Sequence, residues 1–99
     1  MVLKTAERIK ELREKNDLTQ TELAKRMNVT RSSVNAWEMG ISIPSTEKIV
    51  ELTFILHTTS DYILGINNDE FLSIYKYSSE EKELIYQMIS YFDSRNQLY

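Results

Sequence analysis

The stretch from Thr19 to Gly40 reads TQTELAKRMNVTRSSVNAWEMG and contains two short helical patterns joined by a tight turn. In the first pattern, Glu22 follows Thr19 at a distance of three residues, which is the spacing of a capping box at the start of a helix. The apolar residues that come next recur at helical spacing. We therefore expect a short helix over about Gln20–Met27.

The second pattern begins at Thr30, whose hydroxyl suits the N-cap position of a helix. Val34 and Trp37 lie three residues apart, so we expect them on the buried face of a helix over about Arg31–Met39. Gly40 accommodates the left-handed backbone that commonly follows a helix. The opposite face of this helix is polar and is expected to be exposed.

Caps and apolar spacing predict four more helices around this pair. They run from Thr5, as the cap, to about Lys15; from Ser45 along Ile49, Leu52 and Leu56; from Thr59 or Ser60 to Gly65; and from Ser79 to about Arg95. Residues 67–69 resemble a linker, and residues 71–77 fit either a helical turn or an irregular arm. Two glycines and one proline are too few for the many tight turns of a sandwich or barrel, so an all-α fold is expected.

The composition excludes several classes of protein. The 99 residues contain no cysteine and a single histidine, His57, so disulfides, thiolate metal sites and multi-histidine zinc sites are ruled out. We expect no metal, no cofactor and no enzymatic activity. The chain also has no apolar run of the ~20 residues that cross a membrane and no signal-peptide pattern at its start. A cytoplasmic location is expected.

Charge is divided unevenly along the chain. Residues 1–67 hold nine Lys or Arg and nine Asp or Glu, whereas residues 68–99 hold three and six. Nucleic-acid binders are often basic overall, and this chain has a net charge of −3. If it binds DNA, one face must concentrate the positive charge while the acidic C-terminal part points away.

The motif Gln-x-x-Leu-Ala at residues 20–24, followed by Ser-x-Val-x-x-Trp-Glu at residues 32–38, resembles the lambda-repressor-like helix-turn-helix family of Cro/C1-type (XRE-family) DNA-binding transcriptional regulators. The resemblance covers residues 4–66. It implies an all-α fold with a five-helix DNA-binding domain over residues 1–67. A C-terminal arm and amphipathic helix would then occupy residues 68–99.

The resemblance also places the second helix of the motif in the major groove of double-stranded DNA. Arginine can grip guanine, asparagine can pair with adenine, and alanine can touch the methyl group of thymine. The residues expected to contact bases are Thr30, Arg31, Ser32, Asn35 and Ala36.

Phosphate contacts are expected from other positions. The matching family residues assign this role to Gln20 and Ser33, and helix N-termini supply free backbone N–H groups. The residues expected to contact phosphates are Gln20, Ser33, Ser42, Ser45 and Thr46. Arg13 and Glu38 match a family pair that forms a structural salt bridge between the first and third helices.

Two departures from the family pattern affect these expectations. His57 stands where the family often has glycine, so we expect it in a left-handed conformation. The loop over residues 39–44 lacks the Lys or Arg that some relatives use near the minor groove. The affinity for one half-site should therefore be modest, and DNA binding should depend on dimerisation.

The C-terminal helix carries large apolar side chains at amphipathic spacing, and tyrosine and methionine are favoured at interfaces. The residues expected at a dimer interface are Leu84, Ile85, Met88, Ile89 and Phe92. Two other readings stay open: in one the helix packs on its own domain, and in the other it binds an antagonist protein.

These observations predict a dimeric repressor that reads a palindromic operator through the major groove. The alternative is a DNA-binding antitoxin or regulator whose C-terminal helix docks a different protein. Double-stranded DNA is the expected partner in both cases, and no membrane is expected to take part.

Overall fold

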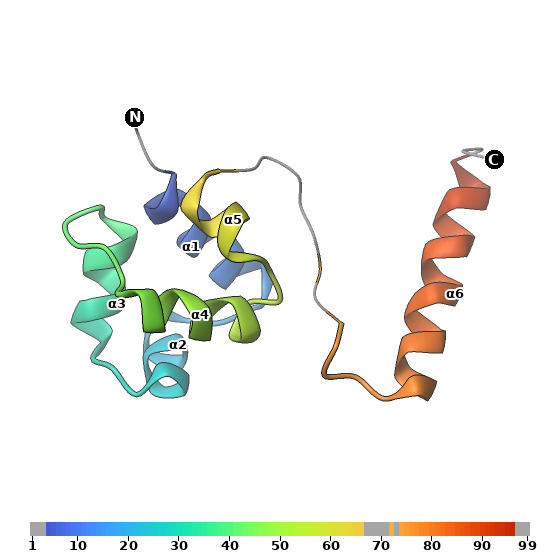
Figure 1. Ribbon diagram of the computed structural model, residues 1–99, viewed down its shortest axis with the longest axis horizontal. Coiled ribbons are helices and arrows are strands. Elements are labelled where there is room, and N and C mark those ends of the chain that lie inside the picture. Colours follow the sequence, from blue (N-terminus) through green and yellow to red (C-terminus); the bar gives the residue numbers. More distant parts are fainter. Residues whose placement is uncertain (1–3, 67–71, 73, 97–99) are drawn as a thin grey trace.

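The computed structural model describes residues 4–66, 72 and 74–96, and these residues form helices and connecting loops without a strand. Five helices make one body, and the sixth stands apart from it (Figure 1). The helices are α1 (Thr5–Lys15), α2 (Gln20–Met27), α3 (Arg31–Glu38), α4 (Thr46–Ile55), α5 (Ser60–Leu64) and α6 (Ser79–Arg95). The expected all-α architecture is confirmed.

The start of α1 differs from the sequence prediction. Lys4 occupies the N-cap position without a side-chain hydrogen bond, and Thr5 lies inside the first turn. Thr5 is buried and its hydroxyl has no hydrogen-bond partner, because its side chain faces the core instead of the free N–H groups of the helix. The prediction that Thr5 caps this helix is therefore wrong, although the bounds of the helix are correct.

Helix α2 begins with the predicted capping box. The Thr19 hydroxyl accepts a hydrogen bond from the backbone N–H of Glu22 at 3.1 Å, and the Glu22 carboxylate accepts one from the backbone N–H of Thr19 at 2.9 Å. This second bond favours the ionised carboxylate and lowers the pKa of Glu22 below its ordinary value. The N–H groups of Thr19 and Glu22 are thereby satisfied.

A left-handed residue makes the turn between α2 and α3. Asn28 has a φ of 56°, and asparagine tolerates this region better than most residues. Helix α3 ends one residue earlier than predicted, since Met39 is its C-cap. Gly40 follows with a φ of 74°, as expected of a glycine after a helix.

Helices α4 and α5 close the body. Ser45 and Thr59 are their N-caps, and each side chain accepts a hydrogen bond from the backbone N–H three residues later. Between the helices, His57 adopts a φ of 55°, which confirms the left-handed conformation expected from the sequence. Gly65 ends α5 with a φ of 78°.

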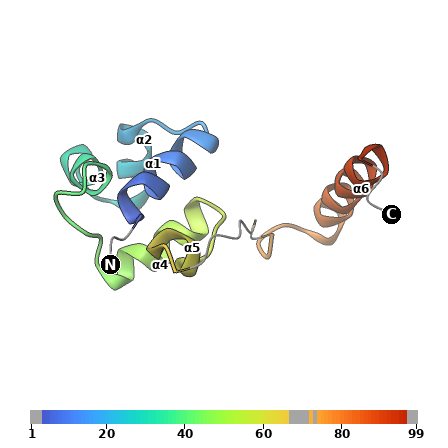
Figure 2. The same cartoon turned by 90° about the horizontal axis from the view of Figure 1, so that it is seen from above.

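Seen from above, α1 to α5 lie together and α6 lies apart from them (Figure 2). One apolar core holds the five helices together. Its buried members are Ile9, Leu12, Leu18, Leu23, Ala24, Met27, Val34, Trp37, Ile49, Leu52, Leu56, Tyr62 and Ile63. The buried Arg8 joins α1 to α5, because its Nη1 donates to the Tyr62 carbonyl oxygen at 2.6 Å and its guanidinium lies 4.1 Å from the centre of the Tyr62 ring.

Residues 74–77 form an irregular arm that contacts the C-terminal end of α4. The ring of Tyr75 lies 5.5 Å from the ring of Phe54, measured between centroids. The ring of Tyr77 stacks on His57 at 5.8 Å, and its hydroxyl lies 3.4 Å from His57 Nε2. Within the arm the Tyr77 backbone N–H donates to the Ile74 carbonyl oxygen at 3.1 Å, which makes one turn, so the described residues of this segment show a feature of each of the two readings. Residues 67–71 and 73, including the expected linker, lie outside the described residues.

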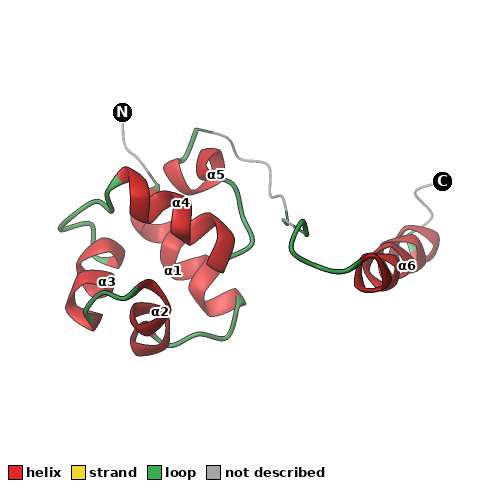
Figure 3. Cartoon of the chain, turned by 60° about the horizontal axis from the view of Figure 1, so that its bottom comes forward, coloured by secondary structure: helices red, strands yellow, loops and turns green. Residues whose placement is uncertain are grey.

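Helix α6 begins with the predicted capping box between Ser78 and Glu81. None of its residues is buried against the described part of the chain. In three views α6 lies on one side of the body and α3 on the opposite side (Figure 3). The reading in which α6 packs back onto its own domain is not the arrangement found in this structure.

Candidate nucleic-acid interface

The recognition helix α3 is held from behind by two apolar side chains. Val34 is fully buried and Trp37 is 7% exposed, and the helix packs against α1 and α2. The motif Ser-x-Val-x-x-Trp thus fixes which side of α3 faces the core. The other side is left for a ligand.

Most of the predicted base-contacting residues lie on this outer side. Arg31, Ser32 and Asn35 are exposed, and Ala36 is half-buried. Arg31 and Ser32 occupy the first turn of α3, which is the part of a recognition helix that reaches base edges in helix-turn-helix proteins. The structure therefore groups these side chains on one surface, as a major-groove reader requires.

Thr30 and Ser33 are engaged with each other. The Thr30 hydroxyl accepts a hydrogen bond from the Ser33 backbone N–H at 3.1 Å, and the two hydroxyl oxygens lie 3.0 Å apart. The Thr30 side chain is therefore the cap of α3, and the Ser33 hydroxyl is paired with it. Thr30 is exposed and Ser33 half-buried, so a hydroxyl of either can still meet DNA at the rim of the helix.

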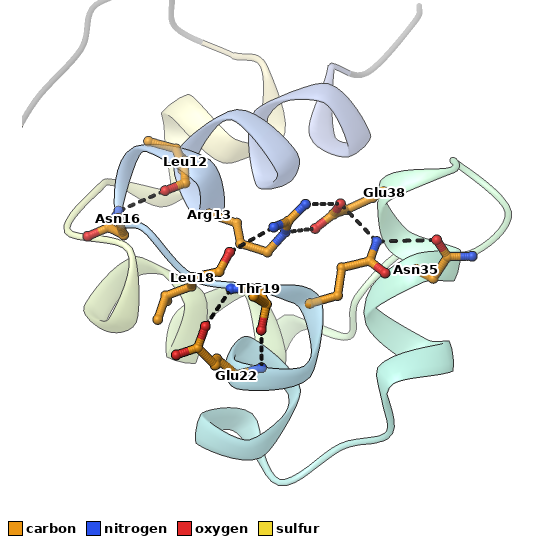
Figure 4. A network of polar contacts seen from close by, with 9 residues as sticks. Leu12, Arg13, Asn16, Leu18, Thr19, Glu22, Asn35 and Glu38 are labelled. Carbon is orange, nitrogen blue, oxygen red and sulfur yellow. Dashed lines mark hydrogen bonds and ion pairs between the residues drawn. The ribbon is translucent and has the colours of Figure 1, made fainter.

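Arg13 and Glu38 form a bidentate ion pair between α1 and α3 (Figure 4). Arg13 Nε donates to Glu38 Oε2 at 2.6 Å, and Nη2 donates to Oε1 at 3.0 Å. The third nitrogen, Nη1, donates to the Leu18 carbonyl oxygen at 2.7 Å. The hydrogen bonds to Glu38 hold the pKa of Arg13 above its ordinary value. Arg13 is thereby occupied as a structural support of α3.

The sequence did not reveal that Gln20 joins this network. Its Nε2 donates to Glu38 Oε1 at 3.1 Å and to Asn35 Oδ1 at 3.2 Å. Because an ionised carboxylate only accepts hydrogen bonds, Glu38 fixes the orientation of the Gln20 amide. Both amide hydrogens are then in use. A phosphate contact from this side chain requires it to release one of these bonds, whereas the backbone N–H groups of the first turn of α2 need no such change.

The same network orients Asn35. Its Oδ1 receives the hydrogen bond from Gln20, and its Nδ2 points away from this bond (Figure 4), on a side chain that is exposed. Nδ2 carries two donor hydrogens. Asn35 therefore presents donors to whatever occupies the surface of α3, and these suit acceptors on purine edges.

The remaining predicted phosphate contacts lie around the start of α4. Ser42, Ser45 and Thr46 are all exposed, and Ser45 caps the helix through the Lys48 backbone N–H at 3.3 Å. Lys48 itself points elsewhere, since its Nζ donates to the Met27 carbonyl oxygen and to Glu51, each at 3.1 Å. This part of the surface thus offers hydroxyls and helix N–H groups rather than cations.

The described ranges offer neither a metal site nor a membrane-spanning helix. Among residues 4–66, 72 and 74–96, no three His, Asp or Glu side chains gather in a way that would hold a metal ion. None of the helices described is long and apolar enough to cross a bilayer.

Two short capped helices joined by an asparagine turn, with a polar outer face on the second, define a helix-turn-helix domain. The profile of the helix-turn-helix family matches residues 9–63, more than half of the chain. The protein belongs to this family, in its Cro/C1-type branch of DNA-binding transcriptional regulators. This class of protein is not enzymatic, in agreement with the sequence prediction.

Several known proteins are similar over the same region. The uncharacterized HTH-type transcriptional regulator YobD of Bacillus subtilis (strain 168) is 32% identical over 63 residues, which are 64% of this chain and 56% of YobD. The HTH-type transcriptional regulator ImmR of the same organism is 31% identical over 58 residues, 59% of this chain and 46% of ImmR. The 26 kDa repressor protein of Escherichia phage HK022 is 34% identical over 55 residues, 56% of this chain and 23% of that protein. The match thus spans about half of the Bacillus relatives and less of the phage repressor.

Solved structures share the fold over nearly the whole chain. A transcriptional regulator from Listeria innocua superposes with a TM-score of 0.63 at 19% identity, covering 95% of this chain and 96% of that one. A structure of the SinR protein/SinI protein complex gives a TM-score of 0.60 at 20% identity, covering 95% of this chain and 86% of that one. At such identities the similarity shows the fold alone.

Proposed function

We propose that the protein is a sequence-specific repressor that binds a palindromic operator as a dimer through the major groove. Its domain over residues 1–67 would bind the DNA, and its arm and helix over residues 68–99 would join two copies. The two recognition helices of a dimer must lie ~34 Å apart to read successive major grooves on one side of the duplex. A promoter covered in this way is closed to transcription.

One observation supports this function above the others. The side chains of Arg31, Ser32 and Asn35 are exposed together on a helix that Val34 and Trp37 anchor from behind. The hydrogen bond from Gln20 also holds the Asn35 amide in one orientation before any ligand binds. A DNA reader gains from this, because preorganised groups lose less entropy on binding.

Selection of bound duplexes from a random pool tests the proposal. We expect a two-fold symmetric consensus with half-sites one helical turn apart, about 10 base pairs from centre to centre. A matched control replaces Arg31 and Asn35 by alanine, since both are exposed and contribute nothing to the core. Enrichment of the same consensus by this variant, or the absence of any consensus at low salt, would contradict the proposal.

The names of the relatives support the repressor reading, since one is a phage repressor and another a transcriptional regulator. We place the site of action in the cytoplasm, where the DNA of a bacterium or of its phage is found.

A second candidate is a DNA-binding antitoxin or regulator whose C-terminal helix docks a different protein. It is favoured by the exposed apolar side of α6, which any suitable partner would cover. The fold neighbour SinR was solved in complex with SinI, which is a property of that protein. The mass of the purified protein in solution separates the candidates, because a monomer with α6 uncovered favours this second one.

A further inference from the structure

Helix α6 exposes a continuous apolar stripe. Leu84 is 61% exposed, Met88 57% and Phe92 51%, and Ile85 and Ile89 flank them on the same side of the helix. Leaving such a stripe in water forgoes the free energy that burial of apolar surface provides. A contiguous exposed patch of this kind marks an interaction surface.

Two opposite charges lie at the two ends of this stripe. Glu81 is seven residues before Met88, and Arg95 is seven residues after it. Seven residues make about two turns of an α-helix, so the three side chains line up along one side. The stripe is thus acidic at its N-terminal end, basic at its C-terminal end and apolar between them, with Met88 at its midpoint.

We propose that the stripe is covered by α6 of a second copy of this chain, running antiparallel, with the two-fold axis passing beside Met88. The proposal deepens the dimer of the proposed function and rests on it. Under this symmetry Glu81 of each copy faces Arg95 of the other, and Leu84 faces Phe92. Each contact occurs twice, as a two-fold interface requires.

The charge pattern selects this orientation over a parallel one. In a parallel pair, Glu81 would face Glu81 and Arg95 would face Arg95, and like charges in contact are unfavourable. The antiparallel pair also places each helix N-terminus, with its partial positive charge, beside the C-terminus of the other helix. A stripe that complements itself after a two-fold rotation is a property expected of a homodimer surface, and a foreign partner does not require it.

Both charged groups keep capacity for this pairing. Glu81 accepts the backbone N–H of Ser78 through Oε1 at 2.8 Å, which leaves Oε2 for a second hydrogen bond. The hydrogen bonds from Ser78 also lower the pKa of Glu81 below its ordinary value, so its carboxylate is charged at neutral pH. Arg95 Nη1 lies 3.5 Å from the Tyr91 hydroxyl, and the guanidinium has five N–H donors in all.

A charge exchange tests the orientation in the 99-residue chain. Arg95→Glu places two carboxylates opposite each other at both ends of the pair, and we expect the dimer dissociation constant in sedimentation equilibrium to rise roughly tenfold. Adding Glu81→Arg to the same chain restores opposite charges and should recover most of the loss, although it also removes the capping box. Ser90→Glu, which adds a negative charge on the far side of α6, is the control and should leave the dissociation constant within about twofold.

Disulfide trapping tests the register. The chain contains no cysteine, so every cross-link comes from an introduced residue. Met88→Cys should cross-link to itself on oxidation, because the two copies of residue 88 meet at the axis. Leu84→Cys should not, since its two copies lie about 12 Å apart along the pair. A mixture of Leu84→Cys and Phe92→Cys chains should cross-link to each other.

The outcomes separate this inference from the proposed function. A wild-type chain that sediments as a monomer up to high micromolar concentration overturns the dimer, and with it both proposals. A dimer whose dissociation constant does not change with Arg95→Glu, or in which Leu84→Cys cross-links to itself, overturns the antiparallel pairing. The dimeric repressor stands in that case. The inference is supported if Arg95→Glu weakens the dimer, if the added Glu81→Arg restores its affinity, and if the expected cross-links form.

Discussion

Arg13 and Glu38 meet across 25 positions of sequence in a pair that is nearly withdrawn from solvent. The side chain of Arg13 is 11% exposed and that of Glu38 only 3%. Glu38 belongs to the recognition helix, and its carboxylate also receives the Gln20 amide. The Glu38 carboxylate therefore links α3 to both other helices, because it binds Arg13 on α1 and Gln20 on α2.

Replacing Arg13 by leucine should destabilise the body strongly. It leaves the carboxylate of Glu38 buried without its cation, and we expect a loss of about 3 kcal/mol in the free energy of unfolding, measured with urea. Glu38→Leu in the same chain should recover part of this loss, since it removes the unpaired charge. Lys15→Gln, which breaks an exposed pair with Glu11, is the control and should cost about 0.5 kcal/mol. Equal losses of unfolding free energy with Arg13→Leu and with Lys15→Gln would contradict the role of the buried pair.

Arg31→Ala should relax the base preference of the protein. On the selected operator we expect a loss of about 1–3 kcal/mol of binding free energy, and little discrimination should remain at the base pair that Arg31 reads. Competition binding with operators altered at each position measures both effects. Arg26→Ala, at an exposed position in the last turn of α2, is a control that should leave the ranking of operators unchanged. A loss with Arg31→Ala that is the same on every sequence would show that Arg31 contacts a phosphate instead.

Gln20→Ala separates two roles of one side chain. If Gln20 releases its bonds and binds a phosphate, the variant should weaken binding to every sequence alike, because phosphate contacts carry no sequence information. The measurement is the same competition series. A changed preference at a single base pair would instead show that the hydrogen bond to Asn35 is what matters, since an unrestrained asparagine amide can turn its oxygen outward.

The features that sequence predicted correctly depend on neighbours in the chain. The capping boxes at Thr19 and Ser78 need residues only three positions apart, and the burial of Val34 and Trp37 follows from helical periodicity. The prediction that Thr5 caps α1 is wrong although threonine is a common N-cap residue. Its burial in the core depends on how the other helices pack against α1, which local sequence does not show.

The features that sequence missed depend on helices brought together by the fold. Gln20 meets Asn35 and Glu38 across 15 and 18 positions, and no local spacing indicates that their side chains reach one another. The contact of the arm with α4 is of the same kind. The sequence indicates a polar residue at the start of one helix and polar residues on the outer face of the next. It does not indicate that these residues form hydrogen bonds with one another.

The hydrogen bond between Glu11 and Tyr62 should make stability depend on pH. The Tyr62 hydroxyl donates to Glu11 Oε1 at 2.8 Å and is the main reason that the pKa of Glu11 lies below its ordinary value. A group with a lowered pKa in the folded state contributes stability above its unfolded pKa and loses it as the pH falls through the folded pKa. Tyr62→Phe keeps the ring beneath Arg8 and removes only the hydroxyl. We expect it to lower the free energy of unfolding by about 1 kcal/mol at pH 7, a value that allows for the exposure of Glu11.

Thermal unfolding at a series of pH values tests this linkage. The difference in Tm between the wild type and Tyr62→Phe should shrink as the pH falls from about 5 through the lowered folded pKa of Glu11, because the carboxylate then becomes protonated in the folded as well as in the unfolded chain. A difference that stays constant over this range would show that the hydroxyl acts through packing and not through the charge of Glu11.

His57→Gly should separate the stability of the body from the placement of α6. At a φ of 55°, histidine costs roughly 1 kcal/mol that glycine avoids, while glycine loses a similar amount through the entropy of the unfolded chain. The Tm should therefore change little. The ring that stacks on Tyr77 is lost, however, so the arm loses one of its two ring contacts at the end of α4, and we expect this loss to release it. Only one residue separates Tyr77 from the start of α6 at Ser79, and a released arm lets α6 sample many positions.

Spin labels on the cysteine-free chain measure this release directly. With one label at Lys10→Cys on α1 and one at Ser90→Cys on α6, pulsed electron resonance reports the distance between body and helix. An excess of unlabelled protein removes distances between copies. The parent chain should give a narrow distribution and His57→Gly a broad one, while Lys76→Ala should stay narrow because its ammonium contacts only the ring of Tyr77 among the described residues. Equally broad distributions in all three chains would mean that the ring contacts of the arm do not hold α6. A narrow distribution with His57→Gly would mean that the contact between Tyr75 and Phe54 is enough to hold α6.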